Sequence, residues 1–224
     1  MAKKKESTLI NMLVALLVIA AVSGGVLGLV YGVTKDAIAE VDQKKNEAAI
    51  KAVLPLENVT YKADTMQFTY EGVNTTFPCN LAFDANGNFQ GAAVKTSEGG
   101  FGGKIDMMVG FLANGTIKGT SVLSHTETPG LGANMTGKFK DQFVDKNPNN
   151  FKLIVKKDGG DVDAITAATI TSRAFSKAVD KAYQAFMANK AQFMNNAPAK
   201  EAAPVMEEAP VEENNETEGG QSNE

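Results

Sequence analysis

Hydroxyl side chains cluster in one short segment of the C-terminal third of the chain. Thr166, Thr169, Thr171 and Ser172 lie within seven positions, and Arg173 follows directly. A helix is predicted to begin here, and a helix N-terminus presents unpaired backbone N–H groups and the positive end of a dipole. Phosphate groups bind at such termini. The residues alone leave two interpretations open: an anion site to which Arg173 adds a cation, or a helix that Thr171 or Ser172 merely caps.

A second polar segment, residues 124–132, follows a predicted strand. Its order is Ser-His-Thr-Glu-Thr-Pro-Gly-Leu-Gly, which combines hydroxyls, an imidazole, a carboxylate and two glycines. The Pro-Gly pair is typical of a turn, beside which backbone N–H groups can face a polar ligand. One histidine without cysteine partners makes a poor metal site, so we interpret His125 as a structural or hydrogen-bonding residue.

Composition and missing motifs exclude several function classes. The single cysteine, Cys79, cannot hold a four-cysteine iron–sulfur cluster, and its default interpretation is a small buried hydrophobe. The net charge of −4 argues against a nucleic-acid partner. The sequence holds no G-x-x-x-x-G-K-[ST], H-E-x-x-H or G-x-S-x-G motif. A hydrolase or nucleotide-binding fold of the usual soluble type therefore has no support.

Taken together, the two polar segments resemble the motifs of the FMN-binding domain family. Residues 166–172 are similar to its S-G-A-T-x-T-S motif, and residues 125–132 to its H-x-E-T-P-G-L-G stretch. The glycine-rich run 99–103 resembles the turn that precedes them. The resemblance covers about residues 7–190. It implies FMN joined covalently through its phosphate to Thr169, with Asp163 as the acidic residue that a dedicated flavin transferase requires.

Two positions depart from the family pattern: Thr166 replaces serine, which is a mild change, and the glycine position 167 is also different. The remaining motif residues give a predicted flavin site. Ala167 stands where the family has glycine, and alanine disfavours a backbone with positive φ. We expect Glu127 and nearby backbone groups to hydrogen-bond the flavin. The full set of expected FMN-binding residues is Thr169, Thr166, Thr171, Ser172, Glu127, Thr128, Leu131, Gly132, Gly100 and Gly102.

The N-terminal region predicts a membrane anchor. Leu9–Val33 contains 25 residues without a charged side chain, and about 20 apolar residues cross a bilayer. Lysines at positions 3–5 precede it, and basic residues stay on the cytoplasmic side. We therefore expect a single span in the bacterial cytoplasmic membrane, with the N-terminus inside and the C-terminal domain outside. A cleaved signal peptide is the alternative, although its apolar region is usually only about 7–15 residues long.

The rest of the chain predicts an α+β domain with antiparallel β-hairpins and flanking helices. A connecting helix, 34–55, is capped by Thr34 and stopped by Pro55. We expect five segments: a cytoplasmic N-terminus (1–8), the span (9–33), the connecting helix, the FMN-binding domain (56–192) and a disordered acidic tail (193–224). Within the domain the patterns predict strands at 59–62, 67–71, 75–84, 89–96, 105–113, 116–124 and 152–156, and helices at 136–144 and 172–189.

The resemblance also implies a place in a larger assembly. An anchored FMN-binding domain of this length is similar to the flavin subunits of Rnf-type complexes, which couple ferredoxin:NAD electron transfer to Na⁺ or H⁺ translocation. Membrane and iron–sulfur subunits would then be partners, and this chain would not be catalytic alone. The alternatives are the related flavin subunit of a Na⁺-translocating NADH:quinone oxidoreductase, a respiratory flavoprotein outside any ion pump, and a non-enzymatic anchored scaffold.

Overall fold

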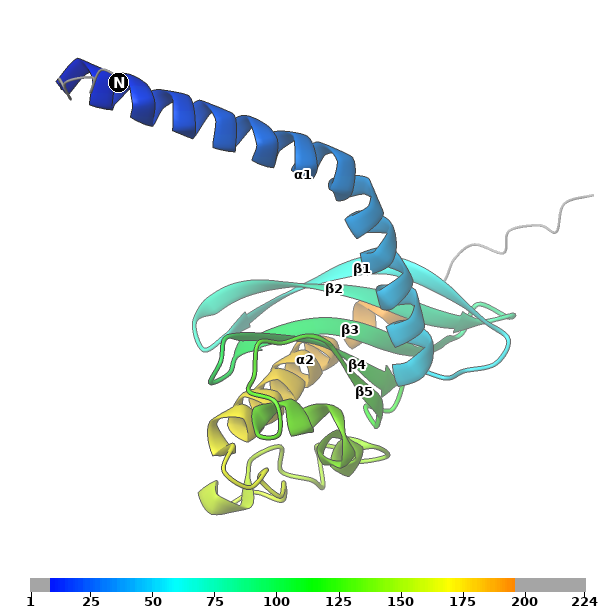
Figure 1. The fold of residues 1–224 in the computed structure, drawn as a ribbon. Helices are drawn as coiled ribbons and strands as arrows, with labels where there is room; N and C mark the ends of the chain where they lie inside the picture. Colours follow the sequence, from blue (N-terminus) through cyan, green and yellow to red (C-terminus); the bar gives the residue numbers. More distant parts are fainter. Residues whose placement is uncertain (1–8, 196–224) are drawn as a thin grey trace, which may run out of the picture.

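The computed structural model of the chain describes residues 9–195. Helix α1 (Leu9–Val53) is followed by a five-stranded sheet, three short 3₁₀ helices and the long helix α2 (Thr169–Asn195). Strands precede helices after α1, so the domain has the predicted α+β architecture (Figure 1). The expected N-terminus 1–8 and most of the expected acidic tail lie outside the described residues, although residues 193–195 continue α2.

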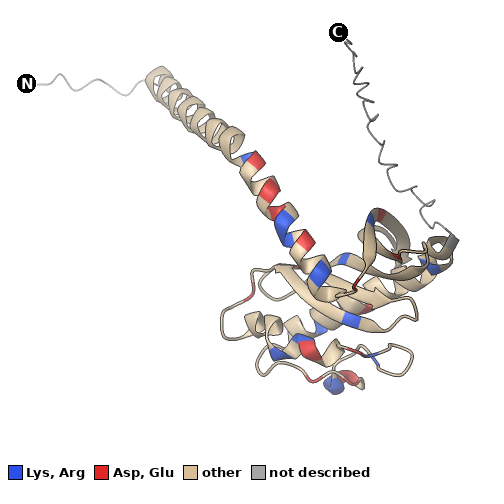
Figure 2. Ribbon diagram, turned by 90° about the vertical axis from the view of Figure 1, so that its right-hand side faces the viewer, with Lys and Arg blue, Asp and Glu red and all other residues tan. Residues whose placement is uncertain are grey.

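Helix α1 joins the predicted span and the predicted connecting helix without a break. Its N-terminal part is long and apolar enough to cross a membrane, and the most apolar window is not buried against the domain. In Figure 2 charged residues appear on α1 only in the part nearest the domain. The expected cap at Thr34 is wrong: its hydroxyl donates to the Val30 carbonyl at 2.8 Å within the helix, as threonines in helix interiors do.

Pro55 ends α1 as predicted, because the residue before a proline is disfavoured in helical geometry. The last turn of α1 buries Val53 against the sheet, where Gly110 and Gly119 pair across two adjacent strands, β4 (Lys104–Leu112) and β5 (Ile117–Ser124). A Cβ atom at Gly110 would overlap the Val53 carbonyl, and one at Gly119 would lie 2.9 Å from the Val53 Cα. These two glycines therefore permit the helix to seat directly on the sheet.

The sheet is an antiparallel meander in the order β1-β2-β3-β4-β5. Its strands are β1 (Val59–Tyr70), β2 (Val73–Asp84), β3 (Phe89–Gly99), β4 (Lys104–Leu112) and β5 (Ile117–Ser124). The two strands predicted at 59–62 and 67–71 are one continuous strand. Hairpins at Gly87 and Gly115, both with positive φ, confirm the predicted Asn-Gly turns.

The two faces of the sheet bury different elements, because successive side chains along a strand point to opposite sides. Leu81 and Phe83 join the larger core under α2, whereas Ala82 joins the smaller core under the end of α1. Figure 1 shows α2 running along one face while the end of α1 crosses the other. The strand pattern thus fixes α2, and with it Thr169, relative to the sheet.

The segment between β5 and α2 is mostly irregular. The predicted helix 136–144 is present as the 3₁₀ helix η2 (Lys138–Phe143), and a second 3₁₀ helix that was not predicted, η1 (Gly132–Thr136), precedes it. The predicted strand 152–156 is wrong, since only Val155 forms an isolated bridge, to Val162. Helix η3 (Lys156–Asp158) and the left-handed Gly159 turn the chain back at this point, so no extended partner strand is available.

Candidate flavin site

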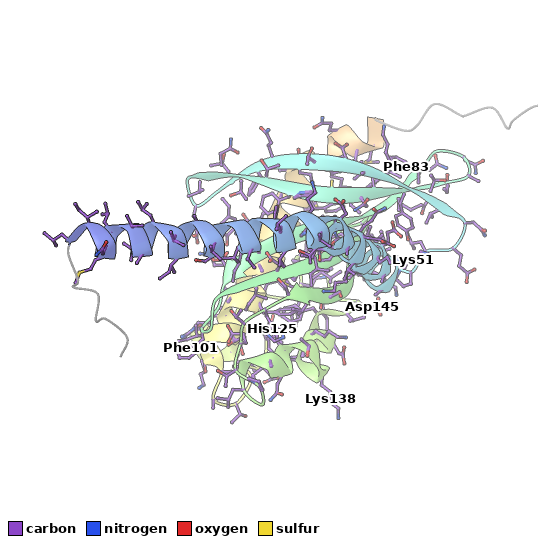
Figure 3. The ribbon with its side chains drawn as sticks, turned by 45° about the horizontal axis from the view of Figure 1, so that its top comes forward. Lys51, Phe83, Phe101, His125, Lys138 and Asp145 are labelled. Atoms are coloured by element: carbon purple, nitrogen blue, oxygen red, sulfur yellow. The ribbon has the colours of Figure 1, made fainter. Side chains whose placement is uncertain are left out.

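A pocket of about 390 Å³ lies at the N-terminus of α2. Three segments that are distant in the sequence meet there: the β3–β4 turn, the loop after β5 and the first turn of α2. Figure 3 shows Phe101 and His125, from the first two of these segments, at one end of the domain. The lining residues are Phe101, Glu127, Thr128, Leu131, Gly132, Ala167, Ala168, Thr169, Ile170 and Thr171.

The sheet topology explains why these loops converge. Strands β3 and β5 flank β4 and run antiparallel to it. They therefore run in the same direction, and their C-terminal ends lie on either side of β4 at the same end of the strands. The glycine-rich turn leaves β3 at that end, and the segment after Ser124 leaves β5 beside it. Helix α2 packs on β3, and Thr171 in its first turn contacts Glu127 of the loop after β5. The glycine-rich turn, the loop after β5 and the start of α2, which are distant in the sequence, are therefore close together in the fold.

Glu127 connects the three segments. Its side chain is only 5 % exposed. One carboxylate oxygen, Oε1, accepts a hydrogen bond from the Gly102 N–H at 2.9 Å. The other, Oε2, accepts one from the Thr171 hydroxyl at 2.7 Å. Because hydrogen bonds to a carboxylate are charge-assisted, these contacts fix the pocket wall more firmly than neutral pairs would.

Glycine is required on both sides of this carboxylate. A Cβ atom at Gly100 would overlap Oε1 of Glu127, and one at Gly132 would overlap Oε2 and lie 2.7 Å from the Thr171 hydroxyl. Gly102 is held in turn by its carbonyl, which accepts from the Thr126 hydroxyl at 2.8 Å. Of the three glycines predicted to bind the flavin, only Gly132 lines the pocket. Gly100 leaves room for the Glu127 carboxylate, and Gly102 donates a hydrogen bond to it.

Thr169 is the first residue of α2 and lines the pocket with a half-buried side chain. The Ser172 N–H donates to the Ala168 carbonyl at 3.0 Å, so the amides of residues 169–171 precede this first helical hydrogen bond. Such amides and the helix dipole attract a phosphate. The first interpretation of the hydroxyl cluster, an anion site, therefore has the required backbone geometry at Thr169.

The other hydroxyl residues of the cluster have different positions. Ser172 is fully buried, and its Oγ accepts from the Ile165 N–H at 2.9 Å while it donates to the Ala168 carbonyl at 3.0 Å. It thereby closes the turn before α2. Thr166 is exposed and lines an adjacent groove with Asp163 instead of the pocket. Only Thr169 and Thr171 of the four hydroxyl residues line the pocket.

Arg173 does not supply the expected cation. Its guanidinium donates two hydrogen bonds to Asp158, at 2.7 and 2.8 Å, and it is not among the residues that line the pocket. This pair lowers the pKa of the Asp158 carboxyl and raises the pKa of Arg173, in each case mainly through the hydrogen bonds between them. The described pocket lining holds no lysine or arginine, so the positive group that these residues place at Thr169 is the helix terminus.

Ala167 occupies the left-handed region, with φ of 60°. This is the backbone for which the family's glycine is suited, because a Cβ in that region costs about 1–2 kcal/mol. The chain adopts the conformation despite the alanine, and the Ala168 N–H closes the turn on the Ile165 carbonyl at 3.0 Å. The substitution thus leaves the turn before Thr169 intact and places strain in it.

Four pocket residues, Phe101, Ala167, Ala168 and Ile170, were not among the predicted FMN-binding residues, and two of them are large and exposed. Phe101 is 71 % exposed and Ile170 is 51 % exposed, and with Leu131 at 42 % they form an apolar rim around Thr169. An apolar rim and a helix N-terminus suit a molecule that joins an aromatic ring system to a phosphate, as FMN does. Phe101 could have been identified from the sequence, because it is an aromatic residue with a pair of glycines on each side.

The remaining candidates have structural roles. His125 is half-buried, and its Nδ1 accepts the Glu127 N–H at 3.2 Å. Among residues 9–195, no group of three histidine, cysteine or acidic side chains is placed to hold a metal ion. Burial raises the pKa of the Cys79 thiol to about 12, so this residue is an unreactive core side chain as predicted.

Comparison with known proteins defines the class first. Residues 100–184 match the family model described as FMN-binding domain, which includes the whole pocket. Together with α1, this makes the chain an FMN-binding protein with a single N-terminal helix that fits a membrane anchor.

The relatives then define the family. The chain is 35 % identical over 182 residues to the G subunit of the ion-translocating oxidoreductase complex of Vibrio atlanticus, covering 75 % of this chain and 86 % of that protein. It is 33 % identical to the protein of the same name from Methanosarcina acetivorans, covering 81 % and 95 %. The chain belongs to this family of G subunits, and it is thus one component of an oxidoreductase complex.

A solved structure, that of the C subunit of Na(+)-translocating NADH-quinone reductase from Parabacteroides distasonis, aligns with a TM-score of 0.48 and 18 % identity. It covers 71 % of this chain and 97 % of that one.

Proposed function

We propose that this chain carries FMN covalently, through a phosphoester between the FMN phosphate and the Thr169 hydroxyl. The observation that carries the proposal is the position of Thr169, the first residue of α2 and part of the pocket wall. The tether has a physical purpose, because a covalently attached cofactor cannot dissociate into an open compartment. When bound, FMN supplies reversible electron transfer, and the protein supplies position and electrostatics.

Each part of the pocket has a role in this proposal. The backbone amides at the start of α2 hold the phosphate. The apolar rim of Phe101, Leu131 and Ile170 covers the ring system, and Thr128 contacts it from the loop after β5. Glu127 and Thr171 hold the wall in place through their hydrogen bond. Gly100, Gly102, Thr166 and Ser172 are assigned as positioning residues around the site.

Attachment requires a flavin transferase that moves the FMN phosphoryl group from an activated donor to the Thr169 oxygen, so that the donor's leaving group and the hydroxyl proton are released. We propose that this enzyme recognises the segment from Asp163 to Thr169. Two features support this. Asp163 is exposed and pairs only at the surface, with Lys156 at 2.8 Å. Thr166 and Asp163 share the groove beside the pocket, so an enzyme that contacts them is brought next to the Thr169 hydroxyl.

We further propose that the flavin relays electrons in an Rnf-type complex that couples ferredoxin:NAD electron transfer to movement of Na⁺ or H⁺. The family membership supports a complex of several different subunits. The single cysteine means that iron–sulfur clusters must belong to partner subunits. The basic residues before the apolar segment support an N-terminus in the cytoplasm, α1 in lipid and the flavin domain outside.

The attachment is tested by producing the full chain together with a flavin transferase and recording in-gel flavin fluorescence after denaturation. The wild-type chain should fluoresce, and Thr169→Ala should not. Thr60→Ala is the matched control, because Thr60 is an exposed threonine of β1 that lines neither the flavin pocket nor the groove beside it. Fluorescence retained in Thr169→Ala would refute attachment at this residue.

A further inference from the structure

A second pocket, of about 460 Å³, adjoins α2 beyond the flavin site. Arg173, Ser176 and Asp180 line it from positions four, seven and eleven residues after Thr169, so they lie on the same face of α2. Ser176 is thus about 10 Å along the helix axis from Thr169. No residue is shared with the lining of the flavin pocket.

An unpaired hydroxyl marks the floor of this second pocket. Ser176 is 2 % exposed, and within residues 9–195 its Oγ has no hydrogen-bond partner. A buried hydroxyl without a partner is costly, and buried polar groups in native proteins are nearly always satisfied. Because Ser176 lines the pocket, rotation of its side chain to another rotamer would turn this hydroxyl toward a ligand there.

Asp180 lies one turn further along α2, close enough to Ser176 to contact the same small molecule. Its Oδ2 accepts the Tyr70 hydroxyl at 3.2 Å and the Gln184 amide at 2.7 Å. Burial is the largest effect that raises the pKa of both Asp180 and Tyr70. Titratable groups shifted by burial in a pocket are typical of binding sites.

Much of the remaining wall is apolar, and most of its charged groups are already paired. Phe151, Leu153 and Val155 form an apolar side. The two cations that α2 contributes already have partners, since Arg173 pairs with Asp158 at 2.7 Å and Lys177 with Glu71 at 2.7 Å. The pocket therefore offers apolar surface, the unpaired Ser176 hydroxyl and the Asp180 carboxylate, and the exposed Lys152 is the cation of its lining that is not paired with a carboxylate within residues 9–195.

We propose that this pocket binds a small uncharged aromatic molecule of one or two rings that carries a hydroxyl group, held between Ser176 and Asp180. The ring packs against Phe151, Leu153 and Val155. The ligand hydroxyl donates to Asp180, and the Ser176 hydroxyl donates to the ligand oxygen. The volume falls in the lower part of the range for small-molecule sites, which is about 300–1,000 Å³.

The test titrates the full chain in detergent with 2-naphthol and measures the bound fraction by equilibrium dialysis. Ser176→Ala at the same detergent concentration is the comparison, so partition into micelles cancels. Loss of one hydrogen bond should weaken 2-naphthol binding about fivefold to tenfold. Naphthalene, which has no hydroxyl, should bind both proteins equally. Ile154→Trp, a change at an exposed wall residue, should block both probes.

Equal 2-naphthol affinity in wild type and Ser176→Ala, or undiminished binding in Ile154→Trp, would overturn the proposal. A melting measurement separates ligand binding from folding. Ser176→Ala should melt at the wild-type temperature or above, because it removes an unpaired buried hydroxyl, and a lower melting temperature would contradict the assignment. Flavinylated and unmodified chains should bind 2-naphthol equally, whereas loss of binding on flavinylation would assign the pocket to the flavin instead.

Discussion

Glu127 and Thr171, 44 positions apart in the sequence, form a buried hydrogen bond of 2.7 Å between the carboxylate and the hydroxyl. This contact joins the loop after β5 to the first turn of α2. The same carboxylate accepts the Gly102 N–H, so one side chain connects the three segments that line the flavin pocket. A threonine that belongs to the motif around Thr169 thus acts through Glu127 to position the pocket wall.

Removal of this carboxylate should destabilise the domain. In Glu127→Ala the Gly102 N–H and the Thr171 hydroxyl lose their partners, and we expect a loss of about 2–4 kcal/mol in the free energy of unfolding. Glu127→Gln should lose only about 1 kcal/mol, because an amide can accept from Gly102 and donate to Thr171. Chemical denaturation of the full chain in detergent measures both. Glu40→Ala, which breaks an exposed pair on α1, is the control and should change stability by less than about 0.5 kcal/mol. An equal effect at positions 40 and 127 would contradict this role.

Restoring glycine at position 167 should stabilise the chain. Ala167 has φ of 60°, and glycine relieves the strain of a Cβ in that region but loses more entropy on folding. We expect a net gain of about 0.5–1 kcal/mol in the free energy of unfolding. Ala182→Gly, inside α2, should have the opposite sign and cost about 1 kcal/mol or more. A destabilising effect of Ala167→Gly would mean that the turn before Thr169 is not strained.

The Arg173–Asp158 pair should affect acid stability and leave flavin attachment unchanged. The pKa of Asp158 is lowered in the folded protein, chiefly by hydrogen bonds from Arg173. Its contribution is therefore present above the unfolded-state pKa of about 3.9 and is lost as the pH falls through the lower folded-state value. Arg173→Gln should remove this part of the pH dependence, measured as melting temperature below about pH 4.

Arg173→Gln also tests whether Arg173 has a structural role or binds the FMN phosphate. Because the Arg173 guanidinium is bound to Asp158, Arg173→Gln should retain the wild-type yield of in-gel flavin fluorescence. A yield reduced by an order of magnitude in a variant that still folds would show that the guanidinium reaches the phosphate after all.

The close packing of the end of α1 on the sheet should leave no room for a side chain at Gly110. A Cβ there overlaps the Val53 carbonyl, and overpacking of this kind costs about 1–3 kcal/mol. Gly110→Ala should therefore lower the melting temperature of the full chain. Gly137→Ala is the matched control, since its added Cβ would be 3.5 Å from the nearest atom, an ordinary contact. Equal melting of the two variants would mean that α1 does not sit tightly on the sheet.

The sequence predicts the elements of this fold well where the signals are local. The Asn-Gly turn at Gly115, the stop at Pro55 and the period-2 strands all depend on neighbouring residues. The predicted helix cap at Thr34 was wrong because α1 continues through this residue, so no helix begins there. The strand predicted at 152–156 failed because strand formation also requires a partner, which the Gly159 turn removes.

The residues of the candidate site also fall into those that the sequence could predict and those that it could not. The resemblance to the FMN-binding domain family implies that Thr169, Glu127 and Leu131 share a pocket, and the structure places all three in one pocket lining. The sequence does not predict that Arg173 turns to Asp158, because that contact depends on how the segment before α2 folds back. The apolar rim residue Ile170 was missed because an exposed side chain at a helix start leaves no periodic signal.

The central claim, a phosphoester at Thr169, is tested most directly by mass spectrometry of the flavinylated chain. Cleavage after Lys157 and Arg173 releases residues 158–173, which contain every hydroxyl of the motif. The account predicts that this peptide gains the mass of FMN less one water, and that fragment ions place the whole gain on Thr169. The gain located on Thr166, Thr171 or Ser172, or an unmodified peptide from a chain that retains flavin after denaturation, would contradict it.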